Sequence, residues 1–282
     1  MSGDAPSPLP GPGPAWTLTA GAWGVFWLTF LMAGPLGDPV LGLALGMGAG
    51  FGGLGTWAAR RVPPPVEARL GLRGFPPRRL GIVLLLAPAV LWVSELDNWV
   101  KLLLDAGTDA ASPDAIGTLG TLEWVLFAVG LRPVLEEFFF RGVLLQSAGA
   151  RLGSARGLAL VTLLFALVRA ASPFGAGDAY RMASLGTGAL LEGALLGASR
   201  LASGSILATI LLQALWGGLG LAAVSAAHQL PIAGFNAPGA HTPAVWLVPS
   251  ALLMAAGLLW ARSAARSSTS LAEQAPAPRP GL

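Results

Sequence analysis

Residues 133–142 read PVLEEFFFRG, a stretch in which Glu136, Glu137 and Arg141 interrupt an otherwise apolar run. No polar neighbours turn these charges into a solvent-exposed helix face. A charged side chain at the centre of a bilayer costs about 2.5–3.5 kcal/mol on insertion scales, so such a cluster persists only if its charges are paired, hydrated or functional. The stretch is therefore a candidate site in a membrane-embedded helix.

The composition is that of an integral membrane protein. Hydrophobic residues make up 54% of the 282 residues and charged residues 11%, less than half of the roughly 25% that is usual in soluble domains. The mean hydropathy is +0.67. Because a span needs about 20 mostly apolar residues, we predict an all-α, multi-span transmembrane helix bundle of about eight helices.

Eight apolar windows divide the chain into predicted spans. They lie at 16–32, 40–58, 80–93, 122–146, 158–171, 182–197, 205–226 and 244–260. We predict one membrane domain over residues 16–262. A tail rich in Pro, Gly and Ser at 1–15 and an Ala-Pro tail at 263–282 are expected to be disordered.

The distribution of arginine predicts the orientation. Six arginines lie between the second and third spans, at 60, 61, 69, 73, 78 and 79, and six more fall on the same side, at 151, 156, 200, 262, 266 and 279. Only Lys101 and Arg181 lie on the opposite side. Loops rich in Lys and Arg face the cytoplasm. We therefore expect a multi-pass protein of the cell membrane with both termini in the cytoplasm.

The composition also excludes several classes of site and partner. The chain has no Cys, which excludes disulfides, thiol nucleophiles and thiolate zinc sites. The formal net charge is only +3 and the arginines are spread over loops, so nucleic acid is not an expected partner. The only histidines, His228 and His241, fall in the last external loop and are expected to be exposed side chains, so we predict neither a metal nor a cofactor.

Helical spacing offers a structural explanation for the embedded charges. Glu137 and Arg141 are four residues apart and can form an ion pair on one helix, and so can Arg132 and Glu136. Internal ion pairs or a catalytic site would each account for the pattern, and spacing alone favours neither. Glu192 has no opposite charge at helical spacing, so we expect it to pair with Arg169 or Arg132 across the bundle, with a polar substrate contact as the alternative.

The stretch RPVLEEFFFRGVLLQ resembles the first motif of the CPBP intramembrane proteases, also called the CAAX protease or Abi family. In that motif two glutamates are followed, after three residues, by an arginine and usually a glycine, and Glu136, Glu137, Arg141 and Gly142 match it. The resemblance covers about residues 122–226. The aromatic run 138–140 is interpreted as helix packing or lipid contact, with substrate recognition as the alternative.

Two further family motifs are recognisable but altered. In LLFALVRAA, Phe165 matches the family phenylalanine and Arg169 takes the place of the histidine. In GSILATILLQALWGG, Gln213 replaces the histidine of the third motif and Gly217 its asparagine.

The resemblance implies that Glu136 would activate water for attack on a peptide carbonyl, with Glu137 and Arg141 as a supporting ion pair. A guanidinium at position 169 would instead hold the Glu136 carboxylate in an ion pair and could not shuttle a proton. Losing an oxyanion donor, as at Gly217, typically costs about 100- to 1000-fold in turnover. We therefore predict a CPBP-type endopeptidase-like protein with weak or lost peptidase activity.

Three alternatives remain open. The first is an active glutamate-dependent intramembrane endopeptidase that acts on a membrane protein or peptide. The second is a scaffold that binds a partner's transmembrane helix in the former substrate groove. The third is a transporter, although the paired Gly- and Pro-broken helices expected of one are not evident in the sequence. The expected partners are the lipid bilayer and a membrane-protein or peptide substrate whose identity the sequence does not specify.

Overall fold

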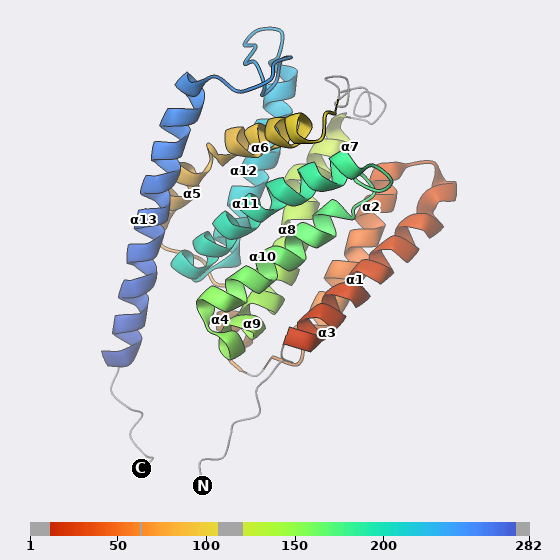
Figure 1. Cartoon of the computed structure of the whole chain (residues 1–282). Coiled ribbons are helices and arrows are strands. Elements are labelled where there is room, and N and C mark those ends of the chain that lie inside the picture. The colour runs from red at the N-terminus through yellow and green to blue at the C-terminus, as the bar shows by residue number, and fades with distance from the viewer. Residues whose placement is uncertain (1–11, 63, 107–120, 275–282) are drawn as a thin grey trace, which may run out of the picture.

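The computed structural model describes residues 12–62, 64–106 and 121–274, and within these ranges the chain is an all-α bundle without a named β-strand (Figure 1). This confirms the predicted fold class. The N-terminal half comprises α1 (Pro12–Ala33), η1 (Gly34–Leu36), α2 (Pro39–Met47), η2 (Gly48–Gly53), α3 (Leu54–Ala59), α4 (Val66–Leu70), η3 (Pro77–Arg79), α5 (Leu80–Leu86) and α6 (Ala89–Leu103). The remainder comprises α7 (Thr121–Val125), η6 (Leu126–Leu131), α8 (Arg132–Glu137), η7 (Phe138–Leu144), α9 (Leu145–Leu152), α10 (Ser154–Ala170), α11 (Ala179–Ser203), α12 (Ile206–Ser225) and α13 (Ala244–Gln274).

Five helical segments of the described chain are long and apolar enough to cross a membrane. They are Pro14–Leu36, Pro39–Ala59, Pro77–Leu103, Ile206–Ser225 and Ala244–Ala265. The other three predicted spans, at 122–146, 158–171 and 182–197, are also helical. These three carry the embedded charges, which lower their mean hydropathy. They lie between α1 and α2 on one side of the bundle and α13 on the other (Figure 1). The protein is thus a multi-pass membrane protein whose most polar helices are central.

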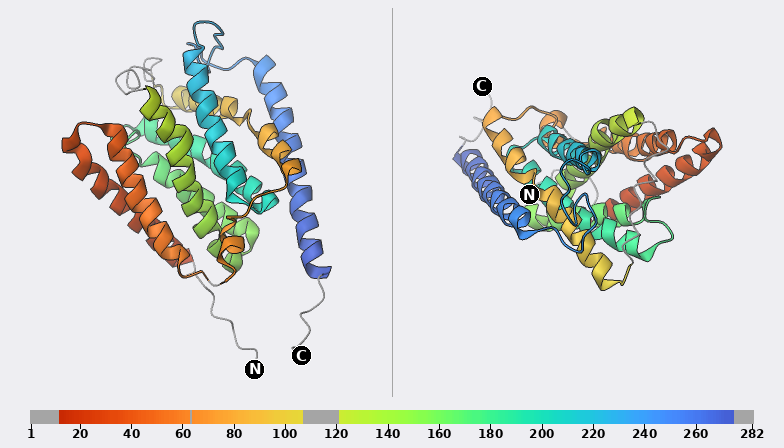
Figure 2. Two further views of the ribbon diagram at one scale, coloured as in Figure 1. Left: turned by 180° about the vertical axis from the view of Figure 1, so that it is seen from behind. Right: turned by 90° about the horizontal axis from the view of Figure 1, so that it is seen from above.

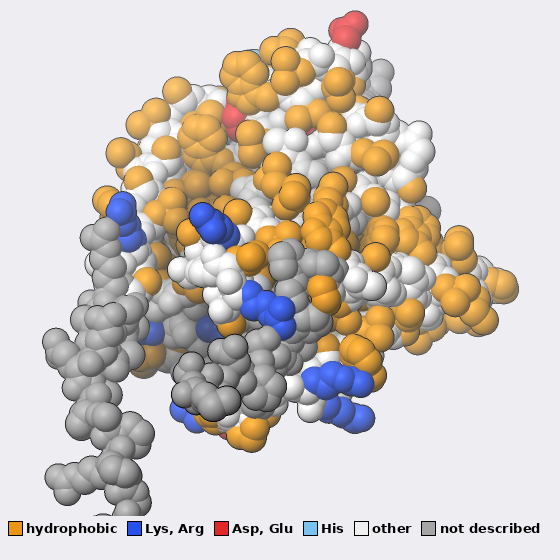
Figure 3. Space-filling model, turned by 60° about the horizontal axis from the view of Figure 1, so that its bottom comes forward, with side chains coloured by type: hydrophobic (Ala, Val, Ile, Leu, Met, Phe, Trp, Pro, Cys, Tyr) orange, Lys and Arg blue, Asp and Glu red, His pale blue; other side chains and the backbone are white. Residues whose placement is uncertain are grey.

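The ends of the bundle differ in charge. The start of α1, the end of α13 and the arginine-rich connection between α3 and α5 lie at one end (Figure 1). Lys and Arg side chains gather at that end, whereas hydrophobic side chains cover the flanks (Figure 3). Exposed tryptophans lie close to both ends, at positions 16, 57 and 260 near the arginine-rich end and 99 and 246 near the other. Such aromatic belts are typical of the two membrane interfaces.

Two helices run further than the predicted spans. Helix α13 continues to Gln274, into the region predicted as a tail. Residues 1–11 and 275–282, which belong to the two predicted tails, lie outside the described part of the chain. The third predicted span ends at residue 93, but α6 continues to Leu103 after a break at Ala87 and Pro88. Glu95, which follows the third predicted span, therefore lies within α6. Polar residues of this part of the helix bond to neighbouring elements.

The helix that carries the charged motif is continuous from residue 121 to 152 but contains two π-helical segments, η6 and η7. Pro133 is the second residue after η6. A proline in a helix interior lacks an N–H and clashes with the preceding turn, and a π-helical turn can accommodate both effects. The segments also rotate the faces of the helix, so ordinary α-helical spacing does not give the direction of each side chain.

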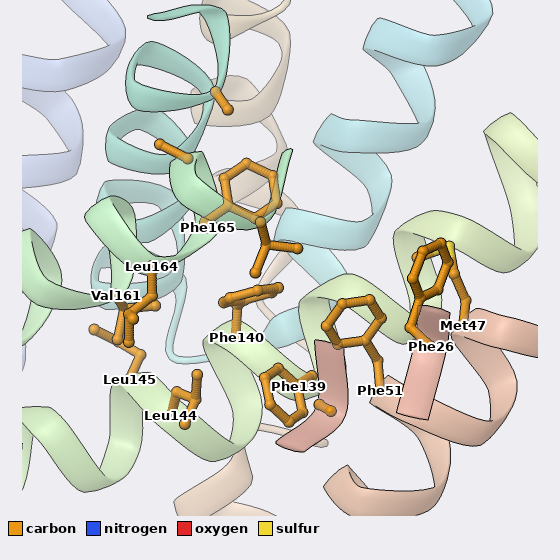
Figure 4. Close-up of a cluster of buried hydrophobic side chains, with 14 of the residues drawn as sticks. Phe26, Met47, Phe51, Phe139, Phe140, Leu144, Leu145, Val161, Leu164 and Phe165 are labelled. Atoms are coloured by element: carbon orange, nitrogen blue, oxygen red, sulfur yellow. The ribbon is translucent and has the colours of Figure 1, made fainter. Parts of the chain in front are cut away.

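Aromatic packing fixes this helix in the core. Phe139 and Phe140 are fully buried, and their rings lie 5.2 Å from the rings of Phe51 and Phe165, respectively (Figure 4). Edge-to-face contacts of this kind contribute about 0.5–1.5 kcal/mol beyond the burial of area. The packing role predicted for the aromatic run is thereby confirmed for these two residues.

A stripe of glycines joins α1 to α2. Gly42, Gly46 and Gly50 recur every four residues, and a Cβ at Gly46 would lie 2.9 Å from the carbonyl oxygen of Phe26 on α1. Small residues at this spacing let helix backbones approach closely where lipid supplies no hydrophobic driving force.

We predict that Gly46→Ala destabilises the bundle by about 1–3 kcal/mol, because the added methyl group forces α1 and α2 apart. The matched control is Gly48→Ala, two residues away, where a Cβ meets no atom within 4 Å. This control should be neutral, or more stable by up to about 1 kcal/mol, because alanine favours a helix. Unfolding of the detergent-solubilised protein measures both variants, and equal stability of the two would contradict the packing argument.

Candidate functional site

Glu136 is the buried carboxylate at the centre of the candidate site. It lies on α8, and only 4% of its surface is exposed. Its Oε1 atom is 3.3 Å from Nε of Arg132, one turn earlier on the same helix, and 3.6 Å from Nη1 of Arg169 on α10. Its Oε2 atom accepts a hydrogen bond from the side-chain amide of Gln213 on α12. Both carboxylate oxygens are therefore engaged by side chains from three helices.

Two residues of the motifs expected from the resemblance meet at Glu136. Arg169 and Gln213, which the resemblance aligns with the two family histidines, both contact this glutamate. Phe165 lies one turn before Arg169 and packs on Phe140 (Figure 4), which holds α10 against the motif helix. Residues far apart in sequence thus meet at one carboxylate.

Glu137 and Arg141 form a second ion pair, which is more deeply buried. Nη1 of Arg141 is 2.8 Å from Oε1 of Glu137, and the two side chains are 1% and 0% exposed. Arg141 also donates a hydrogen bond to the carbonyl of Gly193 at 3.3 Å, and its guanidinium lies 4.3 Å from the Phe165 ring centroid. The pair expected from helical spacing is present, and it connects the motif helix to α10 and α11.

Arg169 is shared between two carboxylates. Its Nη2 atom is 3.9 Å from Glu192 on α11, so the expected ion pair across the bundle is present. Its Nε atom is buried and has no hydrogen-bond partner among the described residues. Together with Arg132 and Arg141, Arg169 balances the charges of the three embedded glutamates, Glu136, Glu137 and Glu192. The embedded cluster is therefore neutral overall, as a low-dielectric surrounding favours.

Gly217 has a packing role that the sequence did not indicate. A Cβ at this position would lie 3.0 Å from the carbonyl oxygen of Ala128 in η6. The absence of a side chain thus lets α12 approach the motif helix, and this close approach also places Gln213, one turn earlier, against Glu136. An asparagine at position 217 would not fit without a shift of the backbone.

Two cavities adjoin the Glu136 cluster. One, of about 120 Å³, is bordered by Arg132, Arg169, Glu192, Gln213 and Gly217. The other, of about 160 Å³, is lined mainly by aromatic and aliphatic side chains and reaches Glu136 from the side of α1 and α2. Gln213 Oε1 is buried and without a partner in the described chain. The first cavity is large enough for several water molecules, so space for a reactant exists beside the engaged carboxylate.

A further polar network lies on α6 and was missed by the sequence reasoning. Glu95 is only 4% exposed. Its carboxylate accepts hydrogen bonds from the Asn98 side chain at 3.1 Å and from the backbone N–H of Thr242 at 2.8 Å. It also bonds to Nδ1 of His241 at 2.8 Å. The His241 side chain is 43% exposed, as expected, but it also bonds to Glu95 on α6, a partner that the sequence did not indicate. The signal was the glutamate itself, placed within an apolar stretch.

The arrangement limits the chemistry of the Glu136 cluster. Among the described residues no three His, Cys, Asp or Glu side chains gather as metal ligands. A general base must have a lone pair directed at the water that it deprotonates. In Glu136 both oxygens face nitrogen donors, and two of these donors are guanidinium groups that do not release protons under ordinary conditions.

Comparison with protein families places the charged motif in a known context. Residues 118–219 match the family model described as type II CAAX prenyl endopeptidase Rce1-like. The resemblance read from the charged motif is thereby confirmed over this segment, which contains α7 to α11 and most of α12. A search of curated proteins and a search of solved structures each found no match.

We predict that the Arg169 and Glu192 charges are energetically coupled. Arg169→Gln and Glu192→Gln should each destabilise the protein by about 1–3 kcal/mol, because each leaves an unbalanced charge in the bundle. The double variant restores neutrality. Its loss of unfolding free energy should be smaller than the sum of the losses of the two single variants, with a coupling energy of about 0.5–3 kcal/mol. The free energies of unfolding of the native protein, the two single variants and the double variant measure this coupling. Additive losses of stability would show that the two charges are independent. The same cycle on Arg181 and Asp178, an exposed pair at 3.4 Å, serves as control.

We predict that Gly217→Ala lowers stability by about 1–3 kcal/mol through contact with the Ala128 carbonyl. The neighbouring Gly218, where a Cβ meets nothing within 4 Å, provides the control. Gly218→Ala should leave the melting temperature unchanged or raise it. A Gly217→Ala protein as stable as Gly218→Ala would mean that α12 does not depend on this close approach.

Proposed function

Starting from the family match, we propose that this membrane protein retains the scaffold of a CAAX-type intramembrane endopeptidase but has weak or lost peptidase activity. The observation that supports the proposal is the engagement of Glu136. Arg132 and Arg169 lie 3.3 and 3.6 Å from one carboxylate oxygen, and the Gln213 amide bonds to the other.

Three physical effects reduce the reactivity of Glu136. The guanidinium groups of Arg132 and Arg169 lie against one oxygen of the carboxylate, so that oxygen is not free to face a water molecule. Arg169 occupies the position of a histidine that could accept and return a proton, which a guanidinium cannot do. Gly217 has no side chain that could donate a hydrogen bond to a developing oxyanion. The side-chain amide of Gln213 already donates to Glu136.

We also propose that the protein lies in the cell membrane with its arginine-rich end in the cytoplasm. The support is the concentration of arginine at the end where α1 starts and α13 finishes (Figure 3). In this orientation the loops 171–178 and 226–243 lie outside. The expected partners are the bilayer and a membrane-embedded protein or peptide.

We expect the purified protein in lipid nanodiscs to hydrolyse a prenylated CAAX peptide no faster than Glu136→Ala does, because Glu136 is held by ion pairs. Glu67→Ala removes an exposed glutamate that is distant in sequence from Glu136, so it serves as the control for the loss of a glutamate as such. Hydrolysis by the native protein that disappears in Glu136→Ala but persists in Glu67→Ala would establish an active endopeptidase and overturn the proposal.

A gain-of-function variant tests the same proposal from the other direction. Arg169→His and Gln213→His restore the two imidazoles, and Glu192→Gln removes the carboxylate that would otherwise lose its partner. Gly217 is left unchanged because of its contact with Ala128. We expect the triple variant to gain peptide hydrolysis that requires Glu136. If it folds and shows no gain, the alignment of the altered motifs is contradicted.

A further inference from the structure

A third cavity, of about 290 Å³, lies between α6, α11 and α12, on the side of the bundle away from the arginine-rich end. Its lining includes Arg169 and Glu192. These two residues, with Val90 and Val93, also line the smaller cavity beside Gln213. The two spaces therefore adjoin, and together they lead from the outer end of the bundle towards the Glu136 cluster.

The loop 226–243, which joins α12 to α13, covers the outer part of this space. It crosses the end of the bundle beside α6 (Figure 2), and its Phe235 and Asn236 form part of the cavity wall. Helix α6 supplies Ser94 and Asp97 to the opposite part of the wall. Helix α6 and the loop thus both contribute to the wall of the cavity.

The loop has a defined internal structure. The Asn236 side chain accepts a hydrogen bond from the backbone N–H of Ile232 at 2.7 Å and donates to the carbonyls of Leu230 and Ala223 at 3.1 and 2.9 Å. Gly234 adopts a φ of +68°, which suits glycine. The bond from Asn236 to Ala223 also ties the loop to the last turn of α12.

Hydrogen bonds to α6 hold the loop in place, and Glu95 makes two of the four that join the described residues. Its carboxylate bonds to His241 and to the N–H of Thr242, while Asn98, which also donates to Glu95, donates to the carbonyl of Gly234 at 2.7 Å. Ser94 donates to the same carbonyl at 2.9 Å. These bonds join the loop to α6 through polar atoms, while Ile232 of the loop is buried.

We propose that the loop 226–243 is a gate over the outer mouth of the cavity and that Glu95 is the residue that holds it closed. Opening would connect the Arg169 and Glu192 side of the site to the aqueous phase at the end opposite the arginine-rich loops. Water and extended polypeptide segments then reach Glu136 from that end. The gate does not require peptidase activity, so its test is independent of hydrolysis.

The native chain lacks cysteine, which allows a direct test by thiol labelling. Ala189 lines the cavity and is 2% exposed, so Ala189→Cys places a reporter thiol behind the gate. We expect slow reaction of this thiol with a charged, water-soluble maleimide in nanodiscs. Adding Glu95→Ala should raise the labelling rate about tenfold or more, because the variant removes two hydrogen bonds between the loop and a charged group. Glu95→Gln, which keeps an acceptor, should give an intermediate rate.

Three controls separate gating from general loosening. His228→Cys, on the exposed part of the loop, should react rapidly whether or not Glu95 is present. Glu67→Ala should leave the labelling of the reporter unchanged. Gly46→Ala destabilises the bundle away from the gate, so a rise in labelling with Gly46→Ala equal to that with Glu95→Ala would overturn the proposal.

A milder variant keeps the test decisive if Glu95→Ala fails to fold. His241→Ala removes a partner of Glu95 whose side chain is 43% exposed, so the fold should tolerate it. We expect it to raise the labelling rate severalfold. An unchanged labelling rate in a folded His241→Ala or Glu95→Ala protein would show that the loop does not control access to the cavity.

Discussion

The Glu136 carboxylate lies between the guanidinium groups of Arg132 and Arg169, and the remainder of the embedded charge is arranged around this contact. Glu192 balances Arg169, and Glu137 balances Arg141. Because an unpaired charge in an apolar interior is expensive, each of these residues constrains its neighbours. The three most polar helices must therefore lie together at the centre of the bundle, surrounded by helices that can face lipid.

The same contact connects stability with the proposed loss of activity. In an active protease scaffold a free carboxylate and an imidazole would exchange protons with water. The negative charge of such a carboxylate would have no permanent positive partner. Here the site is closed by complementary charges and by the Gln213 amide. Two cavities adjoin the cluster, and the charged side chains in their walls form a stable ion-pair network.

Much of the fold could be predicted because the bilayer imposes a simple rule. Apolar stretches of sufficient length must be helices, and five of the eight predicted spans meet this criterion in the structure. The pairs of Glu137 with Arg141 and of Arg132 with Glu136 followed from helical spacing. The continuation of α6 could not be predicted in the same way, because Glu95 is stabilised by residues more than a hundred positions later in the chain.

The sequence by itself determined the class of protein and the ion pairs of Glu137 with Arg141 and of Arg132 with Glu136. These features depend on composition and on local spacing, which a linear chain displays directly. Only the tertiary structure decided that Arg169 serves two carboxylates, that Gly217 allows α12 to approach Ala128, and that His241 closes a network with Glu95. These contacts depend on distances between helices, and those distances are set by packing across the whole bundle.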